Sequence, residues 1–389
     1  MPLLRGMPPA FWILWTGALI NRMGGFVMPL IALYLTGERG RTVEEAGFIV
    51  ALLGAGSLAS GPAGGFLADH IGRRRTLIFA LVGGAAAMLH LCFARAPAHI
   101  AAAAFLLGLL GDFYRPAVSA AVADLVPAPD RVRAYGLLYW GVNLGFAIGA
   151  AAGGAIASHS WLLLFVGDAA TTLAFALVVW LRVPESRPER DERQPRALPW
   201  APMADLPFVA FISLSFMVTY MFMQSFVALP VDLRDRGVSA AQWGALIALN
   251  GVLIFALQPF AARALAGFAR HRVLAVSAAL VGAGFGLTAI MESLPGYAFS
   301  IAVWTVGEVI MAGIAPAVVA DVAPPGQRGV YQGFYQGSWG AAQLAAPVVG
   351  SLVMGRFGAR ALWTSCVGVG LAAALGQLAL GTLRRIDRS

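Results

Sequence analysis

Charged side chains are scarce in this sequence, and lysine is absent. Only 12% of its 389 residues are charged, whereas 59% are hydrophobic. A soluble domain carries roughly 25% charged residues, which help to cover its surface. The composition therefore excludes a water-soluble fold. Apolar runs recur along the chain, each near the roughly 20 residues that a bilayer-spanning helix needs, and they predict a membrane protein.

Cysteine and histidine are also few. The two cysteines, Cys92 and Cys366, lie within apolar runs and lack the spacing of a disulfide framework or a metal site. The five histidines are dispersed, and the sequence has no nucleophile elbow and no phosphate-binding loop. We therefore expect no cofactor, no metal and no enzymatic activity.

The net charge of +8 does not indicate nucleic-acid binding, because the 27 basic residues are all arginines at the ends of apolar runs. With the N-terminus placed in the cytoplasm, eighteen arginines fall on the inner side of the membrane and seven on the outer side. The positive-inside rule supports this orientation. We expect a multi-pass protein of the cell inner membrane with both termini in the cytoplasm.

Twelve apolar segments predict an all-α membrane protein of twelve transmembrane helices in two pseudo-symmetric six-helix bundles. The first segment is too long for a signal peptide. Residues 183–205, rich in Pro, Arg and Glu, are predicted to be a cytoplasmic linker between bundles 1–182 and 206–389. The predicted helices cover residues 8–36, 45–67, 75–95, 98–122, 134–157, 161–182, 206–230, 240–262, 273–292, 297–320, 331–354 and 359–383.

The two halves contain an internal repeat. Four loop residues recur 197 positions later, where Asp124, Pro127, Arg131 and Gly136 become Asp321, Pro324, Arg328 and Gly333. The same offset relates small residues of the fifth and eleventh helices. Such residues let helix backbones approach closely in lipid, either for ordinary packing or for a moving interface. This helix-packing motif comprises Gly145, Gly149, Gly153, Gly154, Pro347 and Gly350.

The loop after the second predicted helix runs from Gly65 through Asp69 and Gly72 to Arg73, Arg74 and Arg75. It resembles the signature between helices 2 and 3 of the major facilitator superfamily. Glycine permits a tight turn, and an acid beside arginines can lock a gate by charge-assisted bonds, although the arginines could also only set topology. The resemblance implies that the acid meets a helix N-terminus. The predicted cytoplasmic gate comprises Gly65, Asp69, Gly72, Arg73, Asp124, Arg131, Asp321 and Arg328.

The second half keeps an arginine at Arg270 but has Ala266 in place of Asp69, so we expect a stronger gate in the first half. The glycine pattern of the fifth helix resembles the drug and metabolite antiporter branch of the family, with Ala150 in place of its proline. Pro347 stands at the matching place of the eleventh helix. The helix-4 arginine of many family antiporters would fall near Ala104 and is absent.

Ionisable residues inside predicted spans are functional candidates. Glu308 lies roughly 16 Å into its helix by helical rise, near the bilayer midplane. The run from Trp304 to Glu308 resembles a helix-10 pattern of multidrug members, whose glutamate takes part in proton coupling. The predicted coupling residues are Glu308, Asp112 and Arg22.

Each coupling residue has an alternative. Glu308 could be a structural partner of an arginine, and Asp112 could pair with Arg115 three residues on. Arg22 could neutralise either carboxylate or hold an anionic substrate. Asp168 could be a solvated group at a helix end.

The family resemblance implies a central substrate cavity. Aromatic walls with scattered amides suit amphipathic organic molecules. The predicted lining comprises Asn21, Tyr139, Trp140, Asn143, Tyr220, Gln224, Trp304, Tyr335, Gln336, Trp339 and Gln343.

The sequence thus predicts proton-coupled efflux of a small amphipathic drug or metabolite by alternating access. Uptake or facilitated diffusion of a small, possibly anionic, nutrient is the alternative. The expected partners are a small-molecule substrate, protons and the lipid bilayer, with no nucleic acid, and we expect a monomer.

Overall fold

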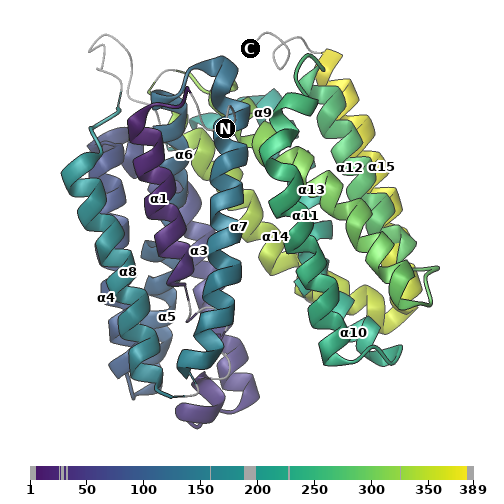
Figure 1. The fold of residues 1–389 in the computed structure, drawn as a ribbon, viewed down its shortest axis with the longest axis horizontal. Coiled ribbons are helices and arrows are strands. Elements are labelled where there is room, and N and C mark those ends of the chain that lie inside the picture. Colours follow the sequence, from purple (N-terminus) through teal and green to yellow (C-terminus); the bar gives the residue numbers. More distant parts are fainter. Residues whose placement is uncertain are drawn as a thin grey trace. The chain divides into compact units, whose positions relative to one another are not determined.

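The computed structural model describes residues 6–25, 27, 30–31, 34–157, 159–187, 199–226, 228–324 and 326–382. Every regular element in these ranges is helical (Figure 1), which confirms the predicted all-α class. Part of the predicted charge asymmetry lies outside the described residues, namely the arginines at positions 5, 190, 193, 196, 384, 385 and 388.

The helices follow the predicted apolar segments in order. In the first half they are α1 (Pro9–Met23), the short π-helix η2 (Tyr34–Glu38), α3 (Val43–Ile71), α4 (Arg73–Phe93), α5 (Pro97–Asp112), α6 (Tyr114–Leu125), the 3-10 turn η3 (Ala128–Asp130), α7 (Arg131–Ala157) and α8 (Trp161–Arg182). In the second half they are η4 (Ala201–Ala204), α9 (Leu206–Met223), η5 (Gln224–Phe226), α10 (Ala228–Asp235), α11 (Ala240–Ala264), α12 (Arg270–Leu287), α13 (Leu294–Val322), α14 (Arg328–Phe357) and α15 (Ala359–Thr382).

Within the described residues, eight spans are long and apolar enough to cross a membrane. They are Glu45–Ile71, Arg73–Phe93, Pro97–Leu125, Trp161–Arg182, Leu206–Phe226, Gln242–Ala264, Leu294–Val322 and Ala359–Gly381. The predicted helix 98–122 is broken at Phe113 into α5 and α6. Pro116 explains the break, because it has no amide hydrogen to donate to the carbonyl of Asp112.

Two compact units are defined by the contacts within the chain. Unit 1 contains residues 1–134, 141–201 and 323–340, and unit 2 contains 135–140, 202–322 and 341–389. The predicted bundles 1–182 and 206–389 differ from these units, because residues 135–140 near the start of α7 belong to unit 2 and the start of α14 belongs to unit 1. The sequence-based boundaries therefore stay a prediction.

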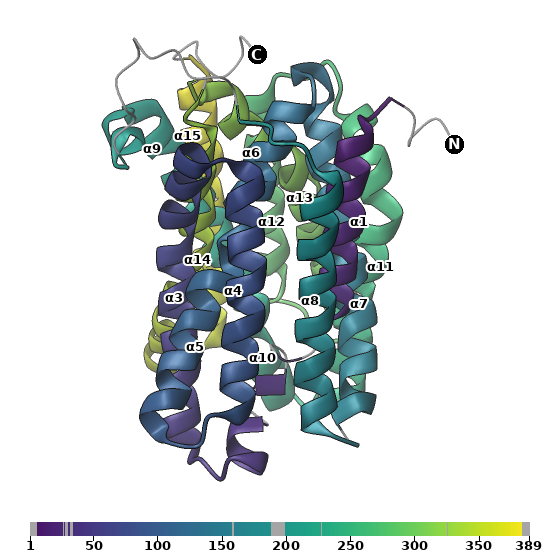
Figure 2. The ribbon, with the colours of Figure 1, turned by 90° about the vertical axis from the view of Figure 1, so that its left-hand side faces the viewer.

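Each unit has its own helix packing. In unit 1, α4 packs against α5 and α8, and α3 packs against α5 (Figures 1 and 2). Tyr34 and Phe165 belong to a hydrophobic core cluster of this unit, and their ring centroids lie 4.7 Å apart. In unit 2, α12 packs against α13 and α15. There Trp304 stacks on Phe285 with ring centroids 5.3 Å apart.

Candidate functional sites

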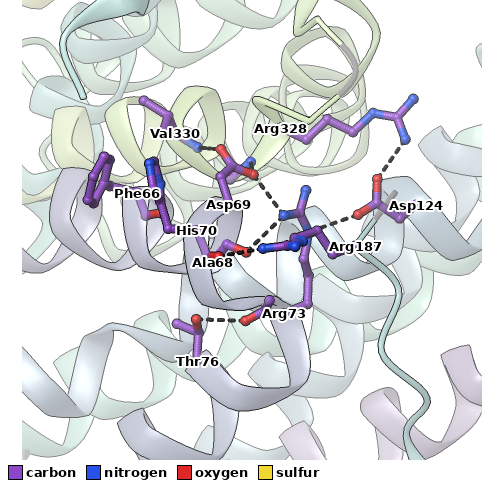
Figure 3. A network of polar contacts seen from close by, with 12 residues as sticks. Phe66, Ala68, Asp69, His70, Arg73, Thr76, Asp124, Arg187, Arg328 and Val330 are labelled. Atoms are coloured by element: carbon purple, nitrogen blue, oxygen red, sulfur yellow. Dashed lines mark hydrogen bonds and ion pairs between the residues drawn. The ribbon is translucent and has the colours of Figure 1, made fainter. Parts of the chain in front are cut away.

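Four of the predicted gate residues form one ion-pair network in unit 1, and we call them the Asp69 cluster: Asp69, Arg73, Asp124 and Arg328 (Figure 3). Arg131 lies beside this cluster, where it donates to the carbonyl oxygen of Ala123 at 2.8 Å. The Asp69 carboxylate accepts hydrogen bonds from the backbone amides of Gly329, at 3.0 Å, and Val330, at 2.7 Å. These amides belong to the first turn of α14 and have no partner within the helix. The positive end of the helix dipole also favours a carboxylate there.

Glycines bring the two backbones together at this point. A Cβ on Gly65 would collide with the carbonyl oxygen of Gly329, and a Cβ on Gly329 would collide with that of Gly65. One turn earlier in α3, a Cβ on Gly61 would lie 2.6 Å from the carbonyl oxygen of Gly333. The small residues therefore allow α3 to lie against the start of α14.

Arg73 lies between two carboxylates. Its guanidinium is 2.8 Å from Asp69 and 2.9 Å from Asp124, and only 1% of the side chain is exposed. It also donates to the carbonyl oxygen of Ala68 at 2.8 Å. Arg328 contacts the second oxygen of Asp124 at 2.7 Å. A buried charge is tolerated only when it is paired and hydrogen-bonded, and this network supplies both conditions.

The repeat is visible in the ion pairs. Arg270 pairs with Asp321 in unit 2, at the offset of 197 that relates them to Arg73 and Asp124. Asp321 therefore lies with its own repeat and not in the Asp69 cluster. Because Ala266 replaces Asp69 there, the second repeat has the arginine–aspartate pair without the additional carboxylate.

Glu185 and Arg187 complete the site, and sequence reasoning assigned both to the linker. Glu185 accepts hydrogen bonds from the backbone amides of Arg73, at 2.8 Å, and Arg187, at 3.0 Å. The Arg187 guanidinium donates to the carbonyl oxygen of His70. Gly72 has a φ of +106°, and a Cβ there would meet the Glu185 carboxylate. The start of the predicted linker therefore bonds to the backbone on both sides of Gly72, at His70 and at Arg73.

A second candidate site surrounds Glu308 in unit 2. Its carboxylate, 5% exposed, accepts hydrogen bonds from the Tyr139 hydroxyl and, at 2.8 Å, from the Asn250 side-chain amide. Asn250 also contacts the Thr305 hydroxyl at 3.0 Å. Among the described residues, no basic side chain forms an ion pair with Glu308. A carboxylate held by neutral donors can take up a proton without breaking an ion pair.

Asn250 was missed by sequence reasoning. The available signal was a lone amide within the apolar run 240–262, since polar side chains inside a span usually face other protein groups. Gln258, eight residues further along α11, is also buried at 3% exposure and faces Gly136 of α7.

Four other charged residues in the interior of the predicted spans lie in unit 1, namely Arg22, Asp112, Arg115 and Asp168. Asp112 pairs with Arg115 at 2.7 Å, which is the structural alternative for Asp112. Asp168 is buried and accepts from the Val27 amide at 3.3 Å, so it is not a solvated group at a helix end. The guanidinium carbon of Arg22 lies 5.9 Å from the centroid of the Tyr114 ring.

The predicted cavity residues divide into packed and less buried groups. Trp304, Gln224 and Tyr335 are buried, at 1%, 0% and 4% exposure. Gln224 donates to the carbonyl oxygen of Ala346 at 3.3 Å and fills the space beside Gly350. Trp304 and Gln224 are thus packed within unit 2, and their role in substrate binding stays a prediction.

The remaining cavity residues are more exposed. Asn21 donates to the Thr172 hydroxyl at 2.9 Å, and Trp140 donates to the carbonyl oxygen of Phe255 at 3.2 Å. Gln343 is exposed, and five residues are partly buried, namely Tyr139, Asn143, Tyr220, Gln336 and Trp339. Their role in substrate binding stays a prediction.

Residues of the helix-packing motif contact α1 in the first half and η5 in the second. A Cβ on Gly145 would lie 2.7 Å from the Cβ of Arg22, and a Cβ on Gly149 would lie 2.9 Å from the Arg22 carbonyl oxygen. Gly350 of α14, which the offset of 197 relates to Gly153, faces Gln224 of η5. Small residues therefore permit close helix contact in both repeats.

Apolar spans, an internal repeat and buried charge networks together define a multi-pass membrane transporter rather than an enzyme. The family model of the Major Facilitator Superfamily matches residues 14–231 and again residues 209–388. The chain belongs to this family, and the predicted fold class is confirmed.

Individual relatives are distant. The chain is 25% identical to the Na(+), Li(+), K(+)/H(+) antiporter of Planococcus maritimus, over 80% of this chain and 81% of that protein. It is also 25% identical to the multidrug resistance protein MdtH of Aeromonas salmonicida, over 83% and 82%. The human organic anion transporter MFSD10 has a similar structure, with a TM-score of 0.82, 19% identity and coverage of 95% of this chain and 100% of the other.

Proposed function

We propose that this transporter exports a small amphipathic organic compound in exchange for protons, by alternating access. The observation that carries the proposal is the buried carboxylate of Glu308, held by Tyr139 and Asn250 without an ion-pair partner in the described residues. Burial makes ionisation costly in lipid. Such a group can load a proton from one side of the membrane and release it to the other.

Two relatives support the coupling and the substrate class. One is named as a cation/H(+) antiporter and the other as a multidrug resistance protein. The first name describes an exchange of protons for a second solute, and the second name concerns resistance to drugs. A drug or metabolite with an apolar body also suits a protein whose predicted lining is rich in aromatic residues.

The Asp69 cluster is the cytoplasmic gate in this proposal. The arginine distribution supports an orientation with these residues, and both termini, on the cytoplasmic side of the cell inner membrane. Bonds from Asp69 to the start of α14 stabilise one conformation of the transport cycle, and their loss shifts the population toward the other. We propose that the transporter works as a monomer.

Purified protein in proteoliposomes tests the proposal. The probes are ethidium, Nile red and 1-pyrenebutyrate, which are cationic, neutral and anionic. An acidic lumen should drive at least one probe into the vesicle against its gradient, and nigericin should abolish this accumulation. Vesicles with Glu308→Gln protein control for passive trapping of weak acids and bases.

The direction of the response separates the candidate functions. Accumulation toward the alkaline side would favour uptake by symport. If the probes move at the same rate with an acidic lumen, with an alkaline lumen and without a pH gradient, proton coupling would be overturned.

A further inference from the structure

Arg22 is a charge without an ionic partner in the part of the chain that the structure describes. Its Nε atom is buried and makes no hydrogen bond there. The two carboxylates of unit 1 in the interior of predicted spans are already engaged, since Asp112 pairs with Arg115 and Asp168 accepts from the Val27 amide. Arg22 lies in the last turn of α1, where the helix dipole offsets part of the cost of the charge. The dipole supplies no hydrogen bond to the buried Nε.

The backbone around Arg22 is held on two sides. On one side, Asn21 bonds to the Thr172 hydroxyl of α8. On the other side, Arg22 packs against Gly145 and Gly149 of α7. A Cβ on either glycine would collide with Arg22. This packing fixes the backbone and the Cβ of Arg22. Binding of a ligand therefore costs less side-chain entropy than it would at a mobile arginine.

The guanidinium lies near an aromatic ring and a second arginine. Tyr114 is 7% exposed, and its ring centroid is 5.9 Å from the Arg22 guanidinium carbon. Arg115, the next residue along the chain, pairs with Asp112. Arg22, Arg115 and Asp112 together carry a net charge of +1.

We infer that Arg22, beside Tyr114, is the subsite for an acidic group of the substrate, so that the transported class is amphipathic organic anions such as carboxylates. This inference rests on the proposed function. A planar guanidinium can donate two parallel hydrogen bonds to a carboxylate. The bound anion would neutralise this partly buried charge, and the apolar body would supply further affinity.

The test compares three probes with one pyrene body and different head groups: 1-pyrenebutyrate, 1-pyrenebutanol and 1-pyrenemethylammonium. Binding to purified protein in nanodiscs is measured by fluorescence, without a proton gradient. The wild type should bind the acid at least about tenfold more tightly than the alcohol or the amine, a difference of about 1.4 kcal/mol. Arg22→Gln should lose this preference and change the affinity for the alcohol less than about twofold.

Two further variants keep the test decisive. Arg22→Lys retains the charge and should keep part of the preference for the acid. Arg234→Gln removes an arginine that is 73% exposed in unit 2 and should bind all three probes as the wild type does. Thermal unfolding of each variant identifies any that fails to fold.

The outcomes separate this inference from the proposed function. Equal binding of acid and alcohol, or unchanged acid binding in folded Arg22→Gln, would overturn the anion subsite. Proton-driven export of only the alcohol or the amine would overturn the subsite and keep the antiport function. Acid binding that depends on Arg22, without any proton-driven movement of the acid, would keep the subsite and overturn antiport.

Discussion

Asp69 is the residue on which most of the first candidate site converges. Its carboxylate accepts from two amides of α14 and contacts Arg73. The aspartate can do this because both oxygens are acceptors when it is ionised. An asparagine would direct an NH2 group toward at least one of these donors.

We predict that Asp69→Asn lowers the transport rate about tenfold while the affinity for substrate changes less than about twofold, because the side chain stabilises a conformation and does not bind substrate. Transport into proteoliposomes and equilibrium binding are measured on the same preparation. Asp130→Asn is the matched control, since Asp130 is 44% exposed and lies 3.9 Å from Arg133. Equal losses of binding and transport would reject the gate role.

The residues of this site differ in how far the sequence reveals them. Asp69 and Arg73 lie in a recognisable loop, and the repeat offset adds Asp124 and Arg328. Glu185 lies in a polar stretch whose composition resembles any solvated linker, so its bond to the backbone amide of Arg73 in α4 was not predictable. Asn250 was visible as a polar residue in a span, but its partner Glu308 depends on how α11 and α13 pack.

The short helix α10 is anchored by a buried carboxylate in unit 2. Asp232, 4% exposed, contacts Arg236 at 2.9 Å and accepts from Trp363 Nε1 of α15 at 2.7 Å. Arg236 donates in turn to the carbonyl oxygens of Thr288 and Met291, at 3.3 and 3.2 Å. The network ties the end of the broken helix α9–α10 to α15 and to the segment after α12.

We predict that Asp232→Ala destabilises the protein by about 3 kcal/mol, because it leaves a partly buried arginine and a buried indole donor unpaired. Thermal unfolding followed by tryptophan fluorescence measures the change. Asp235→Ala is the control, since Asp235 is 55% exposed and pairs with Arg234 at the surface. Surface pairs contribute at most about 1 kcal/mol. A similar melting temperature for the two variants would contradict the anchoring role.

Helix positions were more predictable than helix breaks. Apolar runs of the right length located all the segments, because burial in lipid requires them. The extension of α3 to Ile71 was not predicted, since the polar end of the helix, including Asp69, resembles a loop. The break at Phe113 had a signal in Pro116, but a proline can also be tolerated within a spanning helix.

The two units could not be predicted from the repeat alone. The offset of 197 residues pairs the halves, but residues 135–140 contact unit 2 and residues 323–340 contact unit 1. Residues 135–140 include Tyr139, which bonds to Glu308. Residues 323–340 include Gly329 and Val330, whose amides bond to Asp69. Both candidate sites therefore depend on contacts between segments that the sequence assigns to different bundles.

The proposed membrane orientation is predicted from the arginines and can be tested directly. Cys92 and Cys366 are buried and free, so a background without them should fold. A cysteine at Arg182 should react with an impermeant maleimide only in everted vesicles, and one at Arg234 only in intact cells, because the positive-inside rule puts them on opposite sides. Labelling of Arg182→Cys in intact cells would reverse the orientation.

The central claim is that protonation of Glu308 couples the pH gradient to export. Glu308→Gln mimics a permanently protonated carboxyl and leaves an amide that can still bond to Tyr139 and Asn250. The most direct measurement compares two activities of this variant in the same proteoliposomes, namely uphill accumulation driven by an acidic lumen and exchange of labelled for unlabelled substrate without a gradient. We predict that uphill accumulation falls to the level of protein-free vesicles while exchange continues. Undiminished uphill accumulation in Glu308→Gln would contradict the account.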